Sequence, residues 1–305
     1  MRILVTGASG FIGSKLVEEL KKGHEVRAFV RRETAVPGAE VFVGDIRDSK
    51  SVKSAMKGMG AVFHLAAIRG EKSLRYSEYA KTNIEGTRNV VEAAGGRRLI
   101  HVSTIGVIGL VPGGSEKTTP APKGKYHRSK YEAEKIVAGA ENATIIRPVI
   151  TYGPGEDDGM VFKIAKMLKR GRFFIIGGGG NRVHLLSTDN LIPFMLSVLD
   201  RKETCGQTYI VADPEPIRMN RLCEIISESI GLKGRIRHVP VWPVRLASRI
   251  MELLGLGITR ETVKLATRDR YFRTGKARSA GYNPKVKTED GVRATVKSYL
   301  KEGLI

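Results

Sequence analysis

The sequence predicts a doubly wound α/β protein, a parallel sheet covered by helices on both faces, with a smaller carboxyl-terminal lobe. Three observations predict this class. Short apolar runs rich in β-branched residues alternate with amphipathic segments over the first two-thirds of the chain. The first run leads into three evenly spaced glycines. After Gly153 the alternation stops, and the 305 residues with 41% hydrophobic content suffice for two lobes.

Seven apolar runs read as strands, and four amphipathic segments between them read as helices. The expected strands are residues 2–6, 25–30, 40–44, 61–67, 97–103, 143–148 and, much later, 207–213. The expected helices are 12–21, 49–57, 79–94 and 126–138. Near-continuous apolar strands separated by helices indicate a parallel sheet buried on both faces.

The texture of the chain changes at Gly153. Glycines gather at 153–159 and 177–180, and the later segments no longer alternate regularly. We therefore expect residues 1–152 and 184–213 to form the sheet domain, and residues 153–183 and 214–305 to form the smaller lobe.

The net charge is +21. Such a charge can indicate nucleic acid or anionic lipid as a partner. The basic residues are scattered, with concentrations at 163–172 and 268–278, and no aromatic-interleaved or zinc-finger pattern accompanies them. We expect a solvated basic surface and no nucleic-acid partner.

Cysteine usage and hydropathy bear on the compartment. Cys205 and Cys223 are too few for a disulfide framework and lie in no Cys-x-x-Cys or Cys/His cluster, so we expect a reducing compartment and no metal site. No leader pattern precedes the first strand, which favours a cytoplasmic protein. The apolar segment 239–257 is interrupted by Pro243, Arg245 and Arg249, so we expect no membrane span. A helix covering the core is the favoured interpretation of this segment, and attachment to a membrane surface is the alternative.

The three glycines, Gly7, Gly10 and Gly13, stand in "TGASGFIG" directly after the first strand. A tight turn needs residues that tolerate positive φ, and a pyrophosphate approaches a backbone closely only where no Cβ intervenes. The helix that begins near Phe11 aims its N-terminal N–H groups at such phosphates. This arrangement predicts a dinucleotide site.

The end of the second strand reads Val30, Arg31, Arg32, where an acidic residue would grip the ribose hydroxyls of NAD. An arginine there suits a 2′-phosphate, and a charge-assisted bond would favour NADPH over NADH by ~10- to 100-fold. Arg31 therefore predicts NADP, with NAD as the alternative. Solvated loop charges are the competing interpretation of this arginine pair.

A second motif places Tyr126 and Lys130 four residues apart, on one face of an expected helix. A neighbouring ammonium can lower the pKa of a tyrosine by ~1 to 3 units, into a range useful for proton transfer. Thr104, at the carboxyl end of the fifth expected strand, is placed to bond the same substrate oxygen. Tyr131 and Lys135 repeat the spacing, but Tyr131 points away and is assigned to packing or solvent.

With these motifs the chain resembles the extended short-chain dehydrogenase/reductase family, which includes nucleotide-sugar epimerases, dihydroflavonol-type reductases and 3β-hydroxysteroid dehydrogenases. The resemblance implies a Rossmann sheet. It also implies that Tyr126 is the general acid/base, that Lys130 is its partner and a ribose ligand, and that Thr104 helps to hold the substrate oxygen, with Ser103 as the alternative. The cofactor residues implied are Gly7, Gly10, Phe11, Ile12, Gly13, Arg31, Asp45, Ile46, Leu65, Ala66, Ala67, Asn83, Tyr126 and Lys130.

Departures from the family pattern bear on the branch. Ile108 stands where sugar-converting members carry a tyrosine, and no acidic pair follows Thr104, which disfavours dehydration. We expect an NAD(P)-dependent oxidoreductase acting on a secondary alcohol or ketone. A nucleotide-sugar 4-epimerase that retains NAD is the alternative, and a dinucleotide sensor without chemistry is a third possibility.

Other polar residues complete the sequence expectations. Arg182 is a candidate substrate ligand, although a solvated charge competes with that interpretation. His101 is expected in the core, and His127 off the catalytic face. The acidic loop at Glu156–Gly159 lacks the full ligand set of a calcium site and is expected to be solvated. The resemblance also implies a homodimer through helices that begin at Tyr79 and Tyr126.

Overall fold

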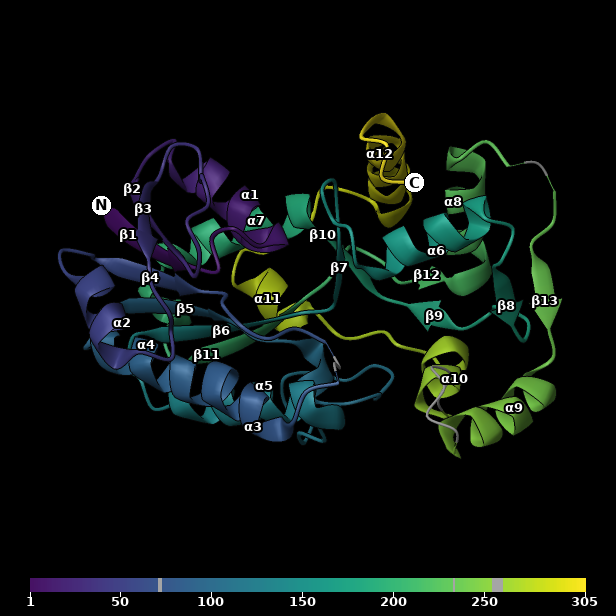
Figure 1. The fold of residues 1–305 in the computed structure, drawn as a ribbon, viewed down its shortest axis with the longest axis horizontal. Helices are drawn as coiled ribbons and strands as arrows, with labels where there is room; N and C mark the ends of the chain where they lie inside the picture. The colour runs from purple at the N-terminus through teal and green to yellow at the C-terminus, as the bar shows by residue number, and fades with distance from the viewer. Residues whose placement is uncertain (71–72, 233, 254–259) are drawn as a thin grey trace.

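Seven parallel strands form the central sheet (Figure 1). The structure is a computed structural model that describes residues 1–70, 73–232, 234–253 and 260–305. The strand order is β11-β6-β5-β4-β1-β2-β3, and every pairing in it is parallel. The bounds are β1 Arg2–Thr6, β2 Glu25–Val30, β3 Glu40–Val43, β4 Ala61–His64, β5 Arg98–Val102, β6 Ala143–Pro148 and β11 Gln207–Val211. They correspond to the seven predicted strands, and the predicted fold class is confirmed.

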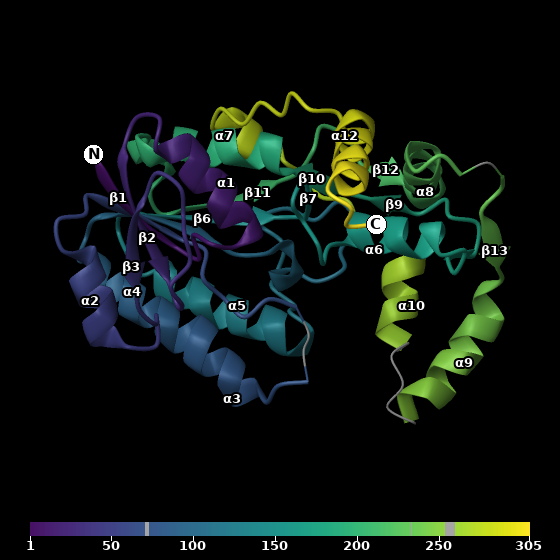
Figure 2. The same ribbon diagram turned by 45° about the horizontal axis from the view of Figure 1, so that its top comes forward.

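Helices cover both faces of this sheet (Figure 2). One face carries α1 (Phe11–Leu20) and α7 (Thr188–Leu199), and the other carries α2 (Ser49–Met56), α4 (Gly86–Ala94) and α5 (Gly124–Val137). The alternation along β1 shows why: Ile3 and Val5 belong to the core under α1, whereas Leu4 belongs to the core under α2 and α4. A sheet apolar on both faces buries both only between two helical layers.

One helical layer contains a wider turn. α3 (Tyr76–Tyr79), the π-helical η1 (Ala80–Glu85) and α4 follow one another without a break in helical backbone. Single π-helical turns often mark functional sites because they re-aim side chains. Here the turn carries Asn83, whose amide enters the protein interior.

The second lobe has a core of its own. It comprises α6 (Met160–Lys169), α8 (Met219–Ser229) and α12 (Thr288–Lys301), with the two-stranded pairs β12-β9 and β13-β8. The bounds are β8 Phe174–Ile176, β9 Arg182–Val183, β12 Ile217–Arg218 and β13 Arg237–Val239. A parallel pair, β7 (Ile150–Tyr152) with β10 (Leu185–Ser187), connects it to the sheet. Three short 3-10 or helical segments lie elsewhere in the described chain: η2 (Ile105–Val107), η3 (Lys202–Thr204) and α11 (Gly275–Ser279).

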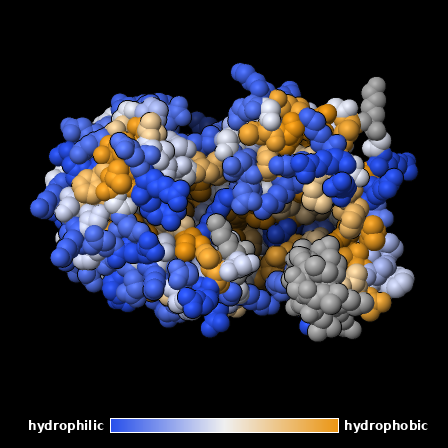
Figure 3. Space-filling model, in the orientation of Figure 1, coloured by the Kyte–Doolittle hydropathy of each residue, from blue (hydrophilic) through white to orange (hydrophobic). Residues whose placement is uncertain are grey.

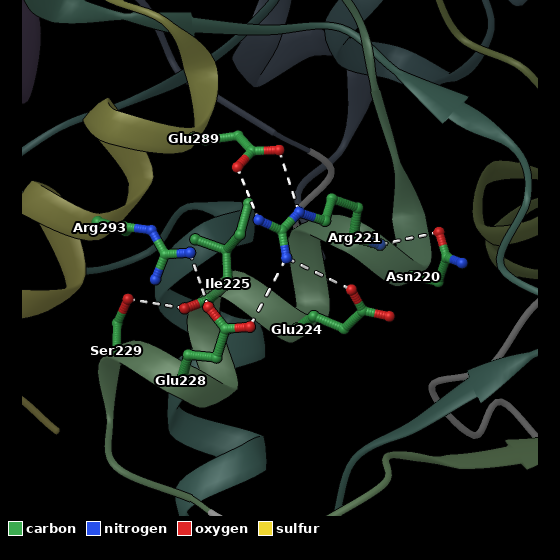
Figure 4. Close-up of polar contacts among 8 residues, drawn as sticks. All are labelled: Asn220, Arg221, Glu224, Ile225, Glu228, Ser229, Glu289 and Arg293. Carbon is green, nitrogen blue, oxygen red and sulfur yellow. Dashed lines mark hydrogen bonds and ion pairs between the residues drawn. The ribbon is translucent and has the colours of Figure 1, made fainter.

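Ion pairs join α8 to α12 at the surface of this lobe (Figure 4). Arg221 donates to Glu289 in a two-pronged pair at 2.8 and 3.1 Å, and Arg293 donates to Glu228 at 2.7 Å. The planar guanidinium fits a carboxylate in this way, which fixes the two helices side by side.

The last part of the chain returns to the sheet. Phe272, Ala277 and Tyr282 lie in the core under α1 and α7, and α11 packs against β11. Residues around α11 thus contact the sheet, although the sequence pattern assigned 214–305 to the smaller lobe.

Helices α9 (Val241–Leu253) and α10 (Arg260–Thr267) stand at the outer end of the second lobe (Figure 1). The last residues of the apolar segment 239–257, from 254 onward, lie outside the described residues. Across the residues that are described, none of the helices has both the length and the hydrophobicity needed to span a bilayer.

Candidate active site

A cleft of about 1090 Å³ lies at the carboxyl edge of the sheet, and residues of both lobes line it. The order of the strands reverses between β1 and β4, which is where open α/β sheets bind ligands. Figure 3 shows the surface hollowed between the two lobes. The sheet side contributes the glycine turn, Arg31, Leu65–Ala67, Ser103–Gly106, Tyr126 and Lys130, and the other side contributes Glu156, Met160, His184, Leu265 and Arg270.

The glycine turn joins β1 to α1 at one end of this cleft. Gly7 takes a φ of 72°, and a Cβ there would lie 2.8 Å from the Ala66 nitrogen. Gly10 is extended and Gly13 is helical, so neither uses positive φ; a Cβ on Gly13 would collide with the Gly7 oxygen. Only the first glycine therefore serves the turn, and the third permits close packing.

The start of α1 is open to an anion. Gly10 is its N-cap, no side chain caps it, and its first turn contains no acidic residue. The first N–H groups of a helix lack partners within the helix, and phosphate oxygens satisfy them well. Phe11 and Ile12 line the cleft at the same place. This donor set fits the pyrophosphate of a dinucleotide.

Buried hydrogen bonds hold the opposing segment, residues 64–67. The Thr87 hydroxyl donates its one proton to the backbone oxygen of Asn83 at 2.6 Å. It therefore accepts the hydrogen bond from Nε2 of His64 at 2.9 Å. Nδ1 of His64 then accepts from Thr6, whose oxygen in turn accepts from the Ala66 nitrogen. Burial lowers the pKa of His64 to about 3, in keeping with this neutral form. His64 thus positions the backbone that faces Gly7.

Of the residues expected near the adenosine, two line the cleft and one does not. Arg31 and Ile46 are lining residues. Asp45 lies outside the lining and accepts from Arg47 at 2.6 and 2.9 Å, and this bond holds the pKa of the Asp45 carboxyl below its usual value. Its expected adenine contact remains a prediction.

Asn83 lies behind the cleft wall. Its Oδ1 accepts from the backbone nitrogen of Ile68 at 2.7 Å, and its Nδ2 donates to the backbone oxygen of Ile68 at 3.0 Å. Nδ2 also donates to the hydroxyl of Ser129 on α5 at 2.9 Å. Ile68 lines the cleft. Asn83 therefore positions the strand-to-helix loop and is not itself a lining residue.

Thr104, Tyr126 and Lys130 are brought together in the cleft. The side chains of Thr104 and Tyr126 share a hydrogen bond. Burial raises the pKa of Tyr126 to about 12, while the charge of Arg69 and the bond from Thr104 lower it. Arg69 is thus a cation, besides the expected Lys130, that favours the phenolate, and the lowering expected from Lys130 stays a prediction.

The side chain of Lys130 is buried against the carboxyl end of β5. Its Nζ donates to the Val102 oxygen at 2.8 Å and lies 3.2 Å from Nε2 of His101. The side chain is 2% exposed, and burial lowers its pKa to about 8, although Glu134 opposes the shift. His101 is buried as expected, and its pKa falls well below the usual value for the same reason.

Ser103, His127 and Tyr131 are neighbours of the motif, and only His127 differs from its expected place. Ser103 also lines the cleft, and its buried hydroxyl has no hydrogen-bond partner within the described residues. His127, expected off the catalytic face, lines the cleft as well, with its ring 5.1 Å from that of Tyr126. Tyr131 lies under the ammonium of Lys135, 5.2 Å from the ring centre, outside the lining.

The smaller lobe presents a different arginine from the one predicted. Arg182 pairs with Asp269 at 2.8 Å and stacks on Tyr271, and it does not line the cleft. Arg270 does, and within the described chain it has no carboxylate partner, while its Nε is buried without any partner. Burial lowers its pKa to about 10. Sequence reasoning missed this residue because only packing distinguishes it from neighbouring arginines.

Glu156 was also missed. The sequence pattern predicted that this acidic loop is solvated. In the structure the Glu156 side chain lines the cleft and is only 2% exposed. Burial raises its pKa to about 7, against the opposing charge of Arg69. No set of three or more His, Cys, Asp or Glu residues within the described ranges could hold a metal ion.

Comparison with known proteins agrees with this geometry. The profile of the NAD dependent epimerase/dehydratase family matches residues 3–212. The 2-alkyl-3-oxoalkanoate reductase of Stenotrophomonas maltophilia (strain K279a) is 32% identical, over 96% of this chain and 98% of that protein. The decarboxylating sterol-4-alpha-carboxylate 3-dehydrogenase of Bos taurus is 29% identical, over 98% of this chain and 92% of that protein.

A solved structure shares the fold. The UDP-glucuronic acid 4-epimerase of Bacillus cereus, in complex with NAD, superposes with a TM-score of 0.80 at 21% identity, covering 99% of both chains.

Proposed function

The chain belongs to the NAD-dependent epimerase/dehydratase family and is an enzyme, and from that premise we propose that it catalyses reversible hydride transfer between NADP and a secondary alcohol or ketone. The observation that carries the proposal is the meeting of Thr104, Tyr126 and Lys130 in one cleft with an uncapped, glycine-led helix start. A sensor without chemistry would not need the three polar side chains.

The cofactor would be held by the residues whose chemistry fits it. The N–H groups at the start of α1 would bind the pyrophosphate, Arg31 the 2′-phosphate, and the 65–67 backbone would lie along it. Lys130 would bond the ribose. When bound, the nicotinamide supplies or accepts the hydride.

Tyr126 would transfer the proton of the substrate oxygen, and Thr104 would orient that oxygen through its own hydroxyl. With the pKa of Tyr126 at about 12 before ligands bind, the phenol is protonated near neutrality and ready to donate to a ketone being reduced. Arg69 and Thr104 lower the cost of the phenolate that results.

The substrate would be an apolar molecule with a carboxylate near its reacting carbon. Arg270 supports this, because a half-buried guanidinium that has no carboxylate partner among the described residues favours an anionic ligand. The names of the two relatives above point the same way, since an oxoalkanoate and a sterol carboxylate are both apolar acids.

A nucleotide-sugar 4-epimerase with tightly held NAD is the second candidate. The same Arg270 would suit a diphosphate, and the similar fold of a UDP-sugar epimerase is compatible with it. In this candidate the hydride returns to the opposite face of the same sugar carbon, so no net oxidation occurs.

The proposed enzyme would divide into a cofactor domain, residues 1–152 and 184–213, and a substrate lobe, residues 153–183 and 214–305, whose α11 segment packs back on the cofactor domain. Pairing of two copies through the helices around residues 79–94 and 126–137 is a further part of the proposal.

Release and identification of any copurifying dinucleotide, followed by titration of the emptied protein with NADPH and NADH, tests the choice. An exchangeable site that prefers NADPH supports the reductase. Stoichiometric NAD that does not exchange would overturn it in favour of the epimerase.

A further inference from the structure

The outer end of the second lobe is formed by two stretches of chain that meet in the β13-β8 pair (Figure 1). The first runs from α6 through residues 170–173 into β8, and the second runs from residue 231 through β13 into α9. Arg237 lies opposite Phe174 in this pair. We call the surface of these stretches the basic end.

The basic end carries uncompensated positive charge. Neither sequence segment, 163–174 or 231–248, contains an acidic residue. Among its exposed cations, Lys163 pairs with Asp158 of the preceding loop at 2.7 Å. The six others are Lys169, Arg170, Arg172, Arg235, Arg237 and Arg245. None of the six pairs with a carboxylate among the residues that the structure describes, whereas Arg182, Arg221 and Arg293 elsewhere all do.

Large apolar side chains stand among these cations. Trp242 is 72% exposed and Leu246 55% exposed, one turn apart on α9, with Arg245 beside them. Met167, Phe174 and Leu232 are exposed on the adjoining segments. Val244 and Ser248 face the interior from the same helix, so over residues 241–248 α9 is held in place by one face while Trp242 and Leu246 stand on the exposed one. Figure 3 shows hydrophilic and apolar surface side by side at this end.

We propose that the basic end docks on the surface of an anionic lipid bilayer. Arginine and lysine are attracted to anionic headgroups, and tryptophan and leucine insert at the headgroup boundary. Nucleic acid would satisfy the cations, but exposed aliphatic side chains such as Leu246 and Met167 gain nothing from a phosphate backbone. The combination of both kinds of side chain favours the bilayer. The docking accounts for part of the net charge of +21, which the reaction does not require.

Docking would bring the cleft close to the bilayer. α10 packs against α9, and its Glu261 and Leu265 line the cleft. An apolar substrate dissolved in the bilayer would then have a short path to Tyr126. This last step rests on the proposed function, whereas the docking itself does not depend on which reaction the enzyme performs.

The chain has a single tryptophan, so its fluorescence reports on the basic end alone. The full-length protein is titrated with vesicles of phosphatidylcholine and with vesicles of equal parts phosphatidylcholine and phosphatidylglycerol. We expect Trp242 emission to move to shorter wavelength with the anionic vesicles only, and the protein to sediment with them. High salt should weaken the binding because it screens the surface charge.

A triple variant, Arg170→Gln/Arg172→Gln/Arg237→Gln, should bind the anionic vesicles about 10- to 100-fold more weakly. The matched control is Lys50→Gln/Lys53→Gln/Lys57→Gln, which removes the same charge from exposed positions on α2 and at the residue that follows it, at the far end of the molecule. The control should bind as the natural protein does, and Leu246→Ser should reduce the spectral shift.

Three outcomes would overturn the proposal. One is an unchanged Trp242 spectrum with anionic vesicles, and another is equal weakening by both triple variants. The third is a spectral shift that appears on concentrating the protein without lipid, which would show that a second copy covers the surface. If duplex DNA binds through these arginines and the vesicles do not, the partner is nucleic acid. NADPH binding, measured on the same variants, keeps a failure of docking distinct from a failure of the proposed reaction.

Discussion

Arg69 and Glu156 form an ion pair across the cleft, with Nη1 of the arginine 3.4 Å from Oε1 of the glutamate. Arg69 follows β4 in the sheet lobe, and Glu156 precedes α6 in the other lobe. The second carboxylate oxygen, Oε2, is buried without a partner among the described residues. The same Arg69 charge lowers the pKa of Tyr126, so one guanidinium links the contact between lobes to the proposed acid.

Glu156→Gln should change how stability depends on pH. The pKa of Glu156 is raised from 4.5 to about 7, so between these values the folded protein holds a proton that the unfolded chain has released. The stability that Glu156 contributes is therefore present at low pH and is lost as pH rises through this window. Relative to Glu156→Gln, the natural protein should lose up to about 3 kcal/mol between pH about 4.5 and about 7. Urea unfolding of both proteins across this pH range measures the difference, and Glu141→Gln, at an exposed position, is the control. If the unfolding free energies of the natural protein and of Glu156→Gln change with pH in parallel, the prediction is wrong.

Tyr126→Phe should reduce kcat by at least ~10²- to 10⁴-fold, because it removes the proton that general acid catalysis requires. NADPH affinity should change little. Tyr131→Phe, on the same helix and outside the cleft, should retain activity. Steady-state assays with an oxoalkanoate and a dinucleotide titration measure the two effects. Full turnover in Tyr126→Phe would refute the assignment of this tyrosine.

Arg31→Ser should weaken NADPH binding by ~10- to 100-fold and leave NADH binding nearly unchanged, since the lost bond is to the 2′-phosphate. The neighbouring Arg32→Ser is the control, because Arg32 is exposed and does not line the cleft. Calorimetric titration with both dinucleotides gives the ratio. An unaltered preference in Arg31→Ser would show that this arginine is a solvated charge.

Arg270→Met should raise stability and weaken the binding of an acidic substrate. Burial lowers the pKa of Arg270 from 12.5 to about 10, so at neutral pH its charge costs about 1 to 3 kcal/mol. A methionine of similar length removes that cost. Thermal unfolding should show the gain, and KM for a 3-oxoalkanoate should rise while KM for its methyl ester does not. Arg268→Met, at an exposed position, should do neither.

The sequence alone determined the sheet and the glycine turn. Strand runs such as Arg2–Thr6 and Ala143–Pro148 are apolar on both faces, and that local pattern has one stable solution, a parallel sheet between helical layers. Tyr126 and Lys130 are four residues apart, so helix geometry alone places their side chains on one face of α5. Family resemblance was carried by the same local motifs, and it is confirmed.

Only the tertiary structure decided which charges are buried and with whom they pair. Arg182 and Arg270 look alike in the sequence, yet one pairs with Asp269 at the surface and the other faces the cleft without a carboxylate partner among the described residues. Glu156 and Asp157 are neighbours, and only the first is buried. Lys130 donates to the Val102 oxygen and lies beside His101, and Arg69, which the sequence pattern did not single out, lowers the pKa of Tyr126. Desolvation and pairing depend on contacts between segments far apart in the chain, which spacing along the sequence does not encode.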